Sequence, residues 1–149
     1  MTERPVAMVL PLLRGAKMKI TYSPRSEKAM KGIHPDLVKV LREYAKDCEM
    51  DLIVTEGLRT PERQKELVSQ GASRTLKSRH ITGHAFDIVG WIVVNGKGQI
   101  SYSGPVMKVI AVGMKAAAKR AKVKIEWGGD WTSFVDQPHY QLPKAEYPA

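Results

Sequence analysis

The segment from Ser78 to Asp87 reads SRHITGHAFD and holds the densest group of metal-binding side-chain types in the chain. Two imidazoles and a carboxylate lie within eight residues, from His80 to Asp87. His80 is predicted in a loop that leads into a strand, because residues 84–94 alternate and are rich in β-forming types. Strand alternation places Asp87 on the face opposite His84. A carboxylate on an otherwise apolar strand face needs a partner, and a metal ion can provide one.

A second group of the same side-chain types follows in the segment DQPH, residues 136–139. A catalytic zinc ion needs about three protein ligands and one open position for water. It also needs a nearby carboxylate, free of the metal, that takes the proton from that water. His80, Asp87 and His139 can supply the ligands, and Asp136 can supply the free carboxylate.

The spacing by itself leaves other interpretations open. His80 could be an exposed loop histidine, Asp87 a helix or turn cap, and Asp136 a turn-forming aspartate. His84 is a rival ligand, although strand alternation turns it away from Asp87. Asp130 is a rival base, although its Gly-Gly-Asp-Trp setting is typical of a structural turn.

The sequence on either side predicts an α+β fold. Thr60 and Pro61 suit the N-cap and first position of a helix, and Asn95-Gly96 suits a hairpin turn. The segment that leads up to His34 is rich in Ser, Arg and Lys and is predicted as a loop. Helices are predicted over residues 35–49, 61–71 and 105–121, and strands over 52–55, 84–94, 99–102, 123–127 and 139–142. This order is not a regular βαβ alternation, which favours α+β.

The length of 149 residues suits one domain with one core. Residues 1–17 lack clear periodicity and are predicted as an N-terminal extension to a domain of residues 18–149. The apolar run from Val6 to Leu13 is short and lacks a small-x-small cleavage site, so we expect no signal peptide and accumulation in the cytoplasm. No apolar stretch approaches the roughly 18 residues that span a bilayer. The single cysteine, Cys48, fits a reducing compartment and is expected in the core.

The chain is strongly basic, with 24 Lys and Arg against 15 Asp and Glu and a formal charge of +9. Such a balance implies a polyanionic partner or setting, and nucleic acid, anionic membrane and bacterial envelope polymers all qualify. The basic residues between Lys115 and Lys124 form a local cluster without interleaved aromatic residues, so a single-strand stacking surface is not indicated. No zinc-finger, basic-zipper or RNA-recognition signature is present.

The pattern SxHxxGxAxD at residues 78–87 resembles the zinc motif of the D-alanyl-D-alanine carboxypeptidase and VanY-like superfamily. The segment EWGGDW at residues 126–131, followed by Asp136-x-x-His139, is more specifically similar to the L-alanyl-D-glutamate peptidases of bacteriophage endolysins. Residues 26–40 and the segment GLRT at residues 57–60 share that similarity, which covers roughly residues 18–142. The resemblance implies a small antiparallel sheet with helices packed against it, like the zinc DD-peptidase/Hedgehog fold.

The resemblance also assigns roles to single residues. It makes His80, Asp87 and His139 the ligands of one zinc ion, and it makes Asp136 the general base. Arg59 matches the family arginine that stabilises the developing oxyanion. Two further matches are implied to line the substrate cleft, namely Gln64 and Ser78.

The implied function is hydrolysis of the peptidoglycan stem peptide between L-alanine and D-glutamate, late in a phage cycle. The expected protein is a monomer without a nucleic-acid partner or stable membrane insertion. It would remain in the host cytoplasm until another protein opens the inner membrane. Three alternatives stay open: a DD-carboxypeptidase or D,D-dipeptidase of the same fold, a non-catalytic wall-binding module, and a nucleic-acid-binding protein driven by the charge.

Overall fold

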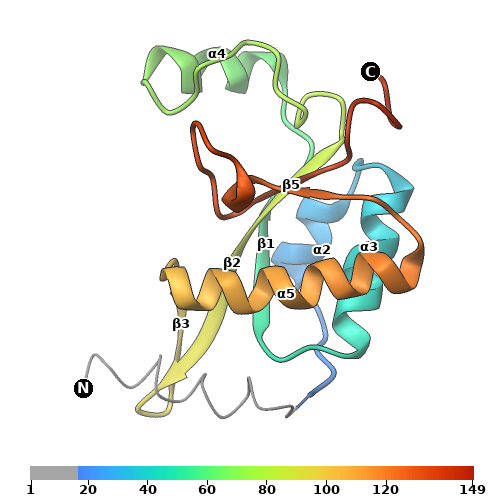
Figure 1. The fold of residues 1–149 in the computed structure, drawn as a ribbon. Coiled ribbons are helices and arrows are strands. Elements are labelled where there is room, and N and C mark those ends of the chain that lie inside the picture. Colours follow the sequence, from blue (N-terminus) through green and yellow to red (C-terminus); the bar gives the residue numbers. More distant parts are fainter. Residues whose placement is uncertain (1–16) are drawn as a thin grey trace.

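A computed structural model describes residues 17–149 as an antiparallel sheet with helices packed against it (Figure 1). The α+β prediction is therefore confirmed. The predicted extension, residues 1–17, lies outside the described residues except for Lys17. The described helices are α2 (Pro24–Met30), α3 (Pro35–Lys46), α4 (Pro61–Ser69) and α5 (Gly104–Ala121), and the strands are β1 (Asp51–Glu56), β2 (Ala85–Val94), β3 (Lys97–Ser101), β4 (Glu126–Trp127) and β5 (His139–Gln141).

Strand β2 is the centre of the sheet, and all of its described neighbours run antiparallel to it. Strand β1 covers one edge of β2, while β5 pairs with the beginning of the other edge and β3 pairs with its end. Strand β4 follows beyond β5, which gives the order β1-β2-β5-β4. In this register Asp87 lies between Glu56 on β1 and His139 on β5.

The helices begin where local capping chemistry places them. The N-cap side chains Ser23, His34, Thr60 and Ser103 each accept a hydrogen bond from a backbone N–H of the first turn, and a proline opens each helix. Helices α3 and α4 start as predicted, although α3 ends at Lys46 rather than near residue 49. Helix α2 was missed, because seven residues with only Ser26 and Met30 buried are too few to display a helical period.

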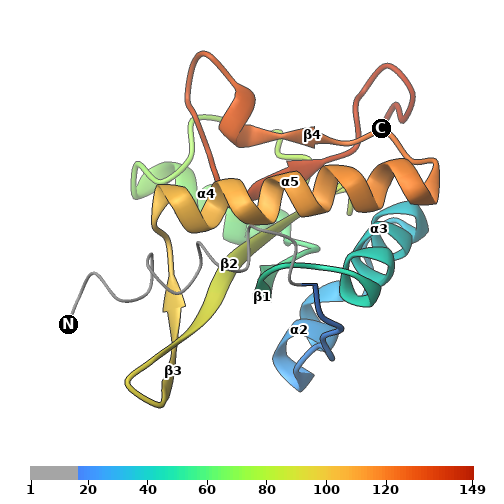
Figure 2. The ribbon, with the colours of Figure 1, turned by 60° about the horizontal axis from the view of Figure 1, so that its bottom comes forward.

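The core lies between the sheet and two long helices. Helices α3 and α5 pack against each other, and α5 runs across β2 (Figures 1 and 2). The core is filled mainly by aliphatic side chains with Tyr44, Phe86 and Tyr140. Cys48 is fully buried, as predicted, and burial raises its thiol pKa to about 11. No helix among residues 17–149 is both long and apolar enough to cross a membrane.

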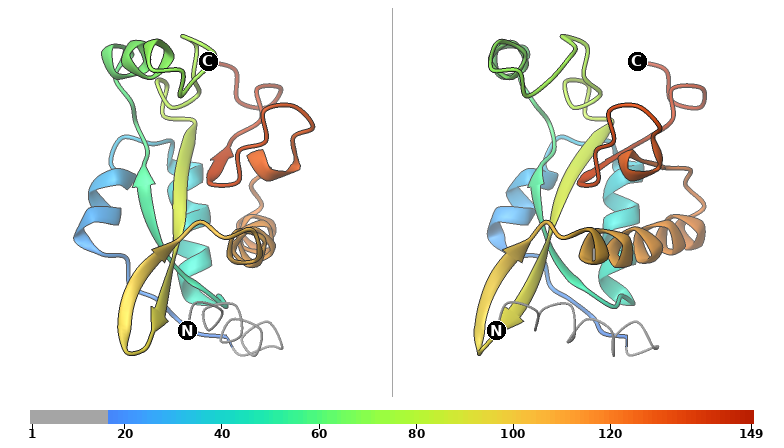
Figure 3. Two further views of the ribbon diagram at one scale, coloured as in Figure 1. Left: turned by 90° about the vertical axis from the view of Figure 1, so that its left-hand side faces the viewer. Right: turned by 60° about the vertical axis from the view of Figure 1, so that its left-hand side comes forward.

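The segments that carry the candidate site gather at one end of the sheet. Helix α4 and the segment up to β2 extend from this end, and residues 128–138, between β4 and β5, form a loop at the same end (Figure 3). Strand β4 is shorter than the predicted strand over 123–127, and residues 128–130 form one turn of 3₁₀ helix. The start of β2 therefore lies where three separate parts of the chain can contribute side chains.

Candidate metal centre

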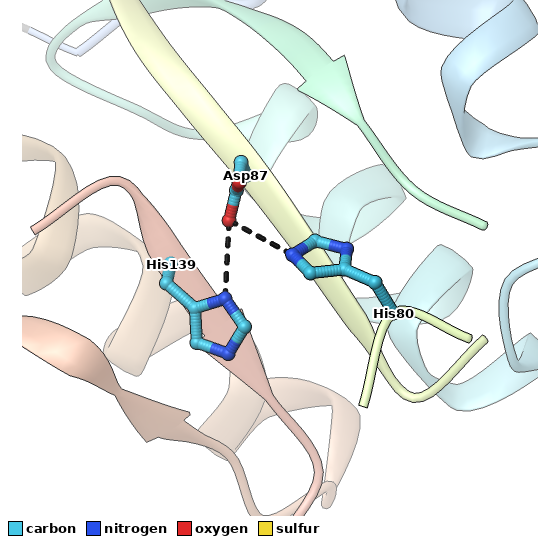
Figure 4. Close-up of side chains that lie close together, drawn as sticks. All are labelled: His80, Asp87 and His139. Carbon is cyan, nitrogen blue, oxygen red and sulfur yellow. Dashed lines mark hydrogen bonds and ion pairs between the residues drawn. The ribbon is translucent and has the colours of Figure 1, made fainter. Parts of the chain in front are cut away.

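Three predicted ligands meet at the start of β2 (Figure 4). His80 comes from the turn before β2, Asp87 from β2 itself and His139 from the first position of β5. The Asp87 Oδ1 atom lies 3.2 Å from His80 Nε2 and 3.1 Å from His139 Nδ1. Both imidazoles are buried, with 2% and 7% of their surface exposed. These three residues form a group whose donor atoms all lie within 4.8 Å of one another.

The outer nitrogen of each imidazole is held by an oxygen atom. His80 Nδ1 lies 2.8 Å from the backbone oxygen of Gly57, and His139 Nε2 lies 2.8 Å from Gln141 Oε1. Carbonyl and amide oxygens only accept hydrogen bonds, so each outer nitrogen carries the hydrogen. The lone pairs of His80 Nε2 and His139 Nδ1 consequently point towards Asp87, which is the arrangement of metal-binding histidines.

Gly57 can approach His80 only because it has no side chain. A Cβ atom at this position would lie 2.1 Å from the backbone oxygen of Ala29 in α2. The glycine therefore lets the segment after β1 lie against α2 while its carbonyl reaches the imidazole. Gly57 belongs to the segment that resembles the family, but the sequence pattern does not predict its contact with His80.

The donor set fits a zinc ion. Zinc–nitrogen bonds of about 2.0–2.1 Å at tetrahedral angles place neighbouring donor atoms about 3.3 Å apart, close to the two donor separations around Asp87. Two imidazole nitrogens and one carboxylate are a common catalytic set, which leaves a fourth position for water. The residues present could therefore hold a metal ion, and they fit zinc in type, in number and in two of their three donor separations.

The protonation of Asp87 depends on the two histidines, and that of His139 depends on Asp87. Burial raises the pKa of Asp87, but hydrogen bonds from His139 and His80 outweigh burial and hold the Asp87 pKa well below its usual range. Burial lowers the pKa of His139, but Asp87 more than compensates, so the His139 pKa is raised. In the metal-free protein a proton held between His139 and Asp87 thus occupies the place that a metal ion would take, and its loss leaves the Nδ1 lone pair facing an ionised carboxylate.

The triad opens into a cleft of about 510 Å³. One wall comes from the segment between α4 and β2, including Ser78, and the other from the loop before β5, including Trp131 and Phe134. Across the mouth, the Arg74 guanidinium lies 4.5 Å from the centre of the Phe134 ring. The Trp131 ring lies 5.3 Å from that of His139, so Trp131 forms part of the cleft wall next to the triad.

Asp136, the predicted general base, lines this cleft together with the triad. The backbone N–H of Asp136 donates to the backbone oxygen of Gly128 at 3.0 Å. A Cβ atom on Gly128 would lie 2.3 Å from the backbone oxygen of Asp136, so the two segments can approach this closely only with glycine at position 128. Burial and the nearby Asp87 charge raise the Asp136 pKa. Asp130, the rival base, instead pairs with Lys115 at 2.6 Å and does not line the cleft.

Arg59 also lines the cleft, and its guanidinium is held in place from behind. Its Nε donates to Glu56 at 2.8 Å, and its Nη1 donates to Gln64 Oε1 at 2.7 Å. Gln64 is fully buried and lies behind Arg59 rather than on the cleft surface. Ser78 does line the cleft, and its hydroxyl accepts the backbone N–H of His80 at 3.2 Å.

Two other histidines lie away from the donor atoms. His84 Nδ1 lies 2.7 Å from the Thr82 hydroxyl, and the His84 ring is 5.5 Å from that of His34. His34 accepts the backbone N–H of Asp36 as the N-cap of α3. His84 thus lies away from Asp87 and outside the donor group, as strand alternation predicted.

Comparisons with known proteins identify the family of the chain. The sequence model described as phage L-alanyl-D-glutamate peptidase matches residues 18–142. An L-alanyl-D-glutamate peptidase of Listeria phage A118 is 36% identical over 102 residues, which make up 68% of this chain and 34% of that protein. An L-alanyl-D-glutamate peptidase of Escherichia phage T5 is 28% identical over 134 residues, which make up 87% of this chain and 94% of that protein.

Among solved structures, the crystal structure of the Serratia marcescens L-Ala D-Glu endopeptidase ChiX is similar, with a TM-score of 0.78 and 41% identity. The match covers 88% of this chain and 96% of the ChiX chain. The chain thus spans about a third of the Listeria phage relative but nearly all of the ChiX chain.

Proposed function

Because the chain belongs to the phage L-alanyl-D-glutamate peptidase family, we propose that it is a zinc-dependent hydrolase of peptidoglycan. The bond cut is that between L-alanine and D-glutamate in the stem peptide. The observation that carries the proposal is the convergence of His80, Asp87 and His139 at the floor of a cleft that Asp136 and Arg59 also line. The Listeria phage, Escherichia phage and Serratia proteins, which are all described as cutting this bond, support it.

The three ligands hold one zinc ion through His80 Nε2, an Asp87 oxygen and His139 Nδ1. When bound, the ion polarises the scissile carbonyl and lowers the pKa of a coordinated water towards neutrality. The protein orients the lone pairs of His80 Nε2 and His139 Nδ1 and the Asp87 carboxylate towards the same position. The hydrogen bonds to Gly57 and Gln141 support this role because they fix both rings.

Asp136 accepts the proton of the attacking water and later delivers it to the leaving amine. Its half-buried position in the cleft supports this assignment, because burial brings the carboxyl pKa closer to the working pH of a general base. Asp136 precedes His139 by three residues, and its backbone is tied to Gly128. The base is therefore held near the triad without belonging to the ligand group.

Arg59 donates hydrogen bonds to the oxyanion that develops on the scissile carbonyl. Its contacts with Glu56 and Gln64 use part of the guanidinium and restrict its movement. A donor that is already oriented needs little reorganisation during the reaction, which is the condition for effective electrostatic stabilisation. Gln64 is in this proposal a support for Arg59, and Ser78 a contact for the substrate.

The cleft suits an anionic peptide. Lys77 and Lys144 line it in addition to Arg59, whereas the acidic lining residues Glu56, Asp87 and Asp136 face Arg59 or the triad. The two lysines can therefore pair with the carboxylates of D-glutamate in the stem peptide. The chain's formal charge of +9 favours association with an acidic cell wall. In the phage cycle the enzyme would act as an endolysin, kept in the host cytoplasm as a monomer until another protein opens the membrane.

Mass spectrometry of fragments from purified peptidoglycan tests the proposal. Cleavage at L-alanine–D-glutamate exposes a new amino group on glutamate, whereas a DD-carboxypeptidase or D,D-dipeptidase releases D-alanine or its dipeptide. A chelator should abolish the release, and added zinc should restore it. Binding to the wall without any released fragment would leave the non-catalytic module as the correct function.

A further inference from the structure

Next to His139, Gln141 also lines the cleft, and through Gln141 the site extends to Glu126 on the neighbouring strand β4. Gln141 follows His139 by two residues on β5, so both side chains lie on the same face of the sheet. Across the β4–β5 ladder, Gln141 is the register partner of Glu126. Gln141 Nε2 donates to Glu126 Oε1 at 3.1 Å, and Gln141 Oε1 lies 2.8 Å from His139 Nε2. A single row of contacts therefore runs from Glu126 to Asp87.

Glu126 sets the direction of this row. An ionised carboxylate accepts hydrogen bonds and has none to donate, so the Gln141 amide must turn its NH₂ group towards Glu126. The amide oxygen is then left for His139, and this oxygen only accepts. His139 must therefore carry its hydrogen on Nε2, which leaves the lone pair of Nδ1 facing Asp87.

The carboxylate at the end of the row has a buried cation nearby. Arg79 is 7% exposed, and its Nη2 donates to the backbone oxygens of Leu142 and Tyr147. Burial lowers the Arg79 pKa, and the Glu126 charge opposes that shift. The two charges therefore compensate each other in a poorly solvated region.

We propose that Glu126 and Gln141 are positioning residues that fix the tautomer and ring orientation of His139 for the metal ion. The proposal rests on the proposed function for the presence of that ion. For His80, the Gly57 backbone oxygen fixes the tautomer and ring orientation, and no side-chain substitution removes this contact. For His139, two side chains fix the tautomer and ring orientation, so mutation can change them.

The test exchanges the carboxylate of Glu126 and the amide of Gln141, first one at a time and then together. Glu126→Gln leaves an amide that can present either its oxygen or its nitrogen, so Gln141 is no longer oriented. Gln141→Glu places two carboxylates opposite each other on adjacent strands, which is unfavourable. The double substitution Glu126→Gln/Gln141→Glu puts the carboxylate next to His139 and the amide behind it, and so again requires a hydrogen on Nε2.

Zinc affinity of the full chain, measured by competition with a chromophoric chelator, is the first readout. Glu126→Gln should weaken zinc binding about 10–100-fold, the usual cost of disturbing an outer partner of a metal-binding histidine. Gln141→Glu should weaken it as well, because repulsion from Glu126 pushes the new carboxylate away from His139. The double substitution should recover most of the loss. Glu146→Gln is the matched control, because Glu146 pairs with Lys124 on the surface and belongs neither to the triad nor to the cleft lining, and it should bind zinc like the parent.

The second readout is nitrogen NMR of the zinc-loaded protein, which shows which His139 nitrogen carries the hydrogen. We expect Nε2 in the parent and in the double variant. Metal binding through His139 Nε2, equal zinc affinity in Glu126→Gln and Glu146→Gln, or a double variant no better than either single variant would overturn the positioning role. Should Glu126→Gln fail to fold, the zinc affinities of Gln141→Glu and the double variant can still be compared, and equal affinities would overturn the positioning role. A parent protein that binds no zinc would overturn the proposed function as well, whereas zinc binding that all variants share would overturn this inference alone.

Discussion

Asp87 and His139 are register partners on adjacent antiparallel strands, and their side chains face each other with Oδ1 and Nδ1 3.1 Å apart. The sheet thereby brings together two residues that are 52 positions apart in sequence. His80 completes the group from the turn that immediately precedes β2. The candidate metal centre is thus a product of strand pairing, and mutations that change its side chains without disturbing the strands can test each proposed role separately.

Asp87→Asn should weaken zinc binding strongly and abolish peptidoglycan cleavage. The substitution keeps the shape of the side chain but removes the charge that both imidazoles face. Because metal binding adds to folding free energy, the midpoint of thermal unfolding should rise on zinc addition in the parent and much less in the variant. His84→Asn, at the histidine that lies away from the triad, serves as control. Unchanged zinc affinity in Asp87→Asn would mean that Asp87 is not a ligand.

Asp136→Asn should keep zinc and lose turnover. An amide cannot take up the water proton, and general-base catalysis typically contributes about 10²–10⁴-fold, so kcat should fall within or beyond that range. Asp130→Asn, a change of the same chemistry at an aspartate outside the cleft, should cut peptidoglycan at nearly the parent rate. A zinc-free Asp136→Asn protein, or one with nearly full turnover, would contradict the assignment of the base.

Arg59→Lys should also retain zinc while kcat falls about 10²–10³-fold, the typical cost of one oxyanion donor. A lysine cannot reproduce the planar fork that contacts Glu56 and Gln64 while still offering a donor to the cleft. Gln64→Leu should show a smaller loss, because the guanidinium remains but loses one of its supports. Steady-state kinetics on a stem-peptide fragment measures both, and Arg63→Lys on the exposed side of α4 is the control. Equal rates in Arg59→Lys and the parent would remove Arg59 from the mechanism.

The metal-free protein should be most stable in mildly acidic solution. The lowered Asp87 pKa stabilises the fold above the unfolded value of about 3.9, and this contribution is lost as the pH falls through the folded pKa. The raised His139 pKa stabilises the fold below the unfolded value of about 6.5, and this contribution is lost as the pH rises through the folded pKa. Both are present together between about pH 4 and 6.5.

Urea unfolding of the metal-free protein across this range measures the effect. The difference in unfolding free energy between the parent and Asp87→Asn should shrink as the pH rises above the folded His139 pKa. Zinc should remove the alkaline loss, because the metal ion replaces the proton between the two side chains. A parent-minus-variant difference that stays constant from acidic to alkaline pH would contradict the coupling.

Removal of residues 1–16 should leave a folded and active enzyme. The family similarity begins at residue 18, and the backbone pairing of Met18 with Cys48 stays intact in such a truncation. Thermal unfolding and hydrolysis of soluble wall fragments should match the full chain. Loss of folding would show that the apolar run from Val6 to Leu13 contributes to the core, and that the boundary of the domain lies further upstream.

The sequence by itself determined the candidate ligands, the starts of α3 and α4 and the strand that carries Asp87. These features follow from short-range rules, because capping depends on residues two or three positions apart and strand alternation on a period of two. The same period separated His84 from Asp87. It also placed Gln141 on the face of His139, a signal that was available and not used.

Only the tertiary structure decided which residues stand behind the site. Gln64, predicted to line the cleft, is buried behind Arg59, because the packing of α4 and the segment after it decides which side of the guanidinium it meets. The partnership of Glu126 with Gln141 depends on the register of β4 against β5, which joins positions 15 residues apart. Such register is set by the whole sheet and its core, so short motifs and the family resemblance can propose the metal ligands but not the side chains that hold them.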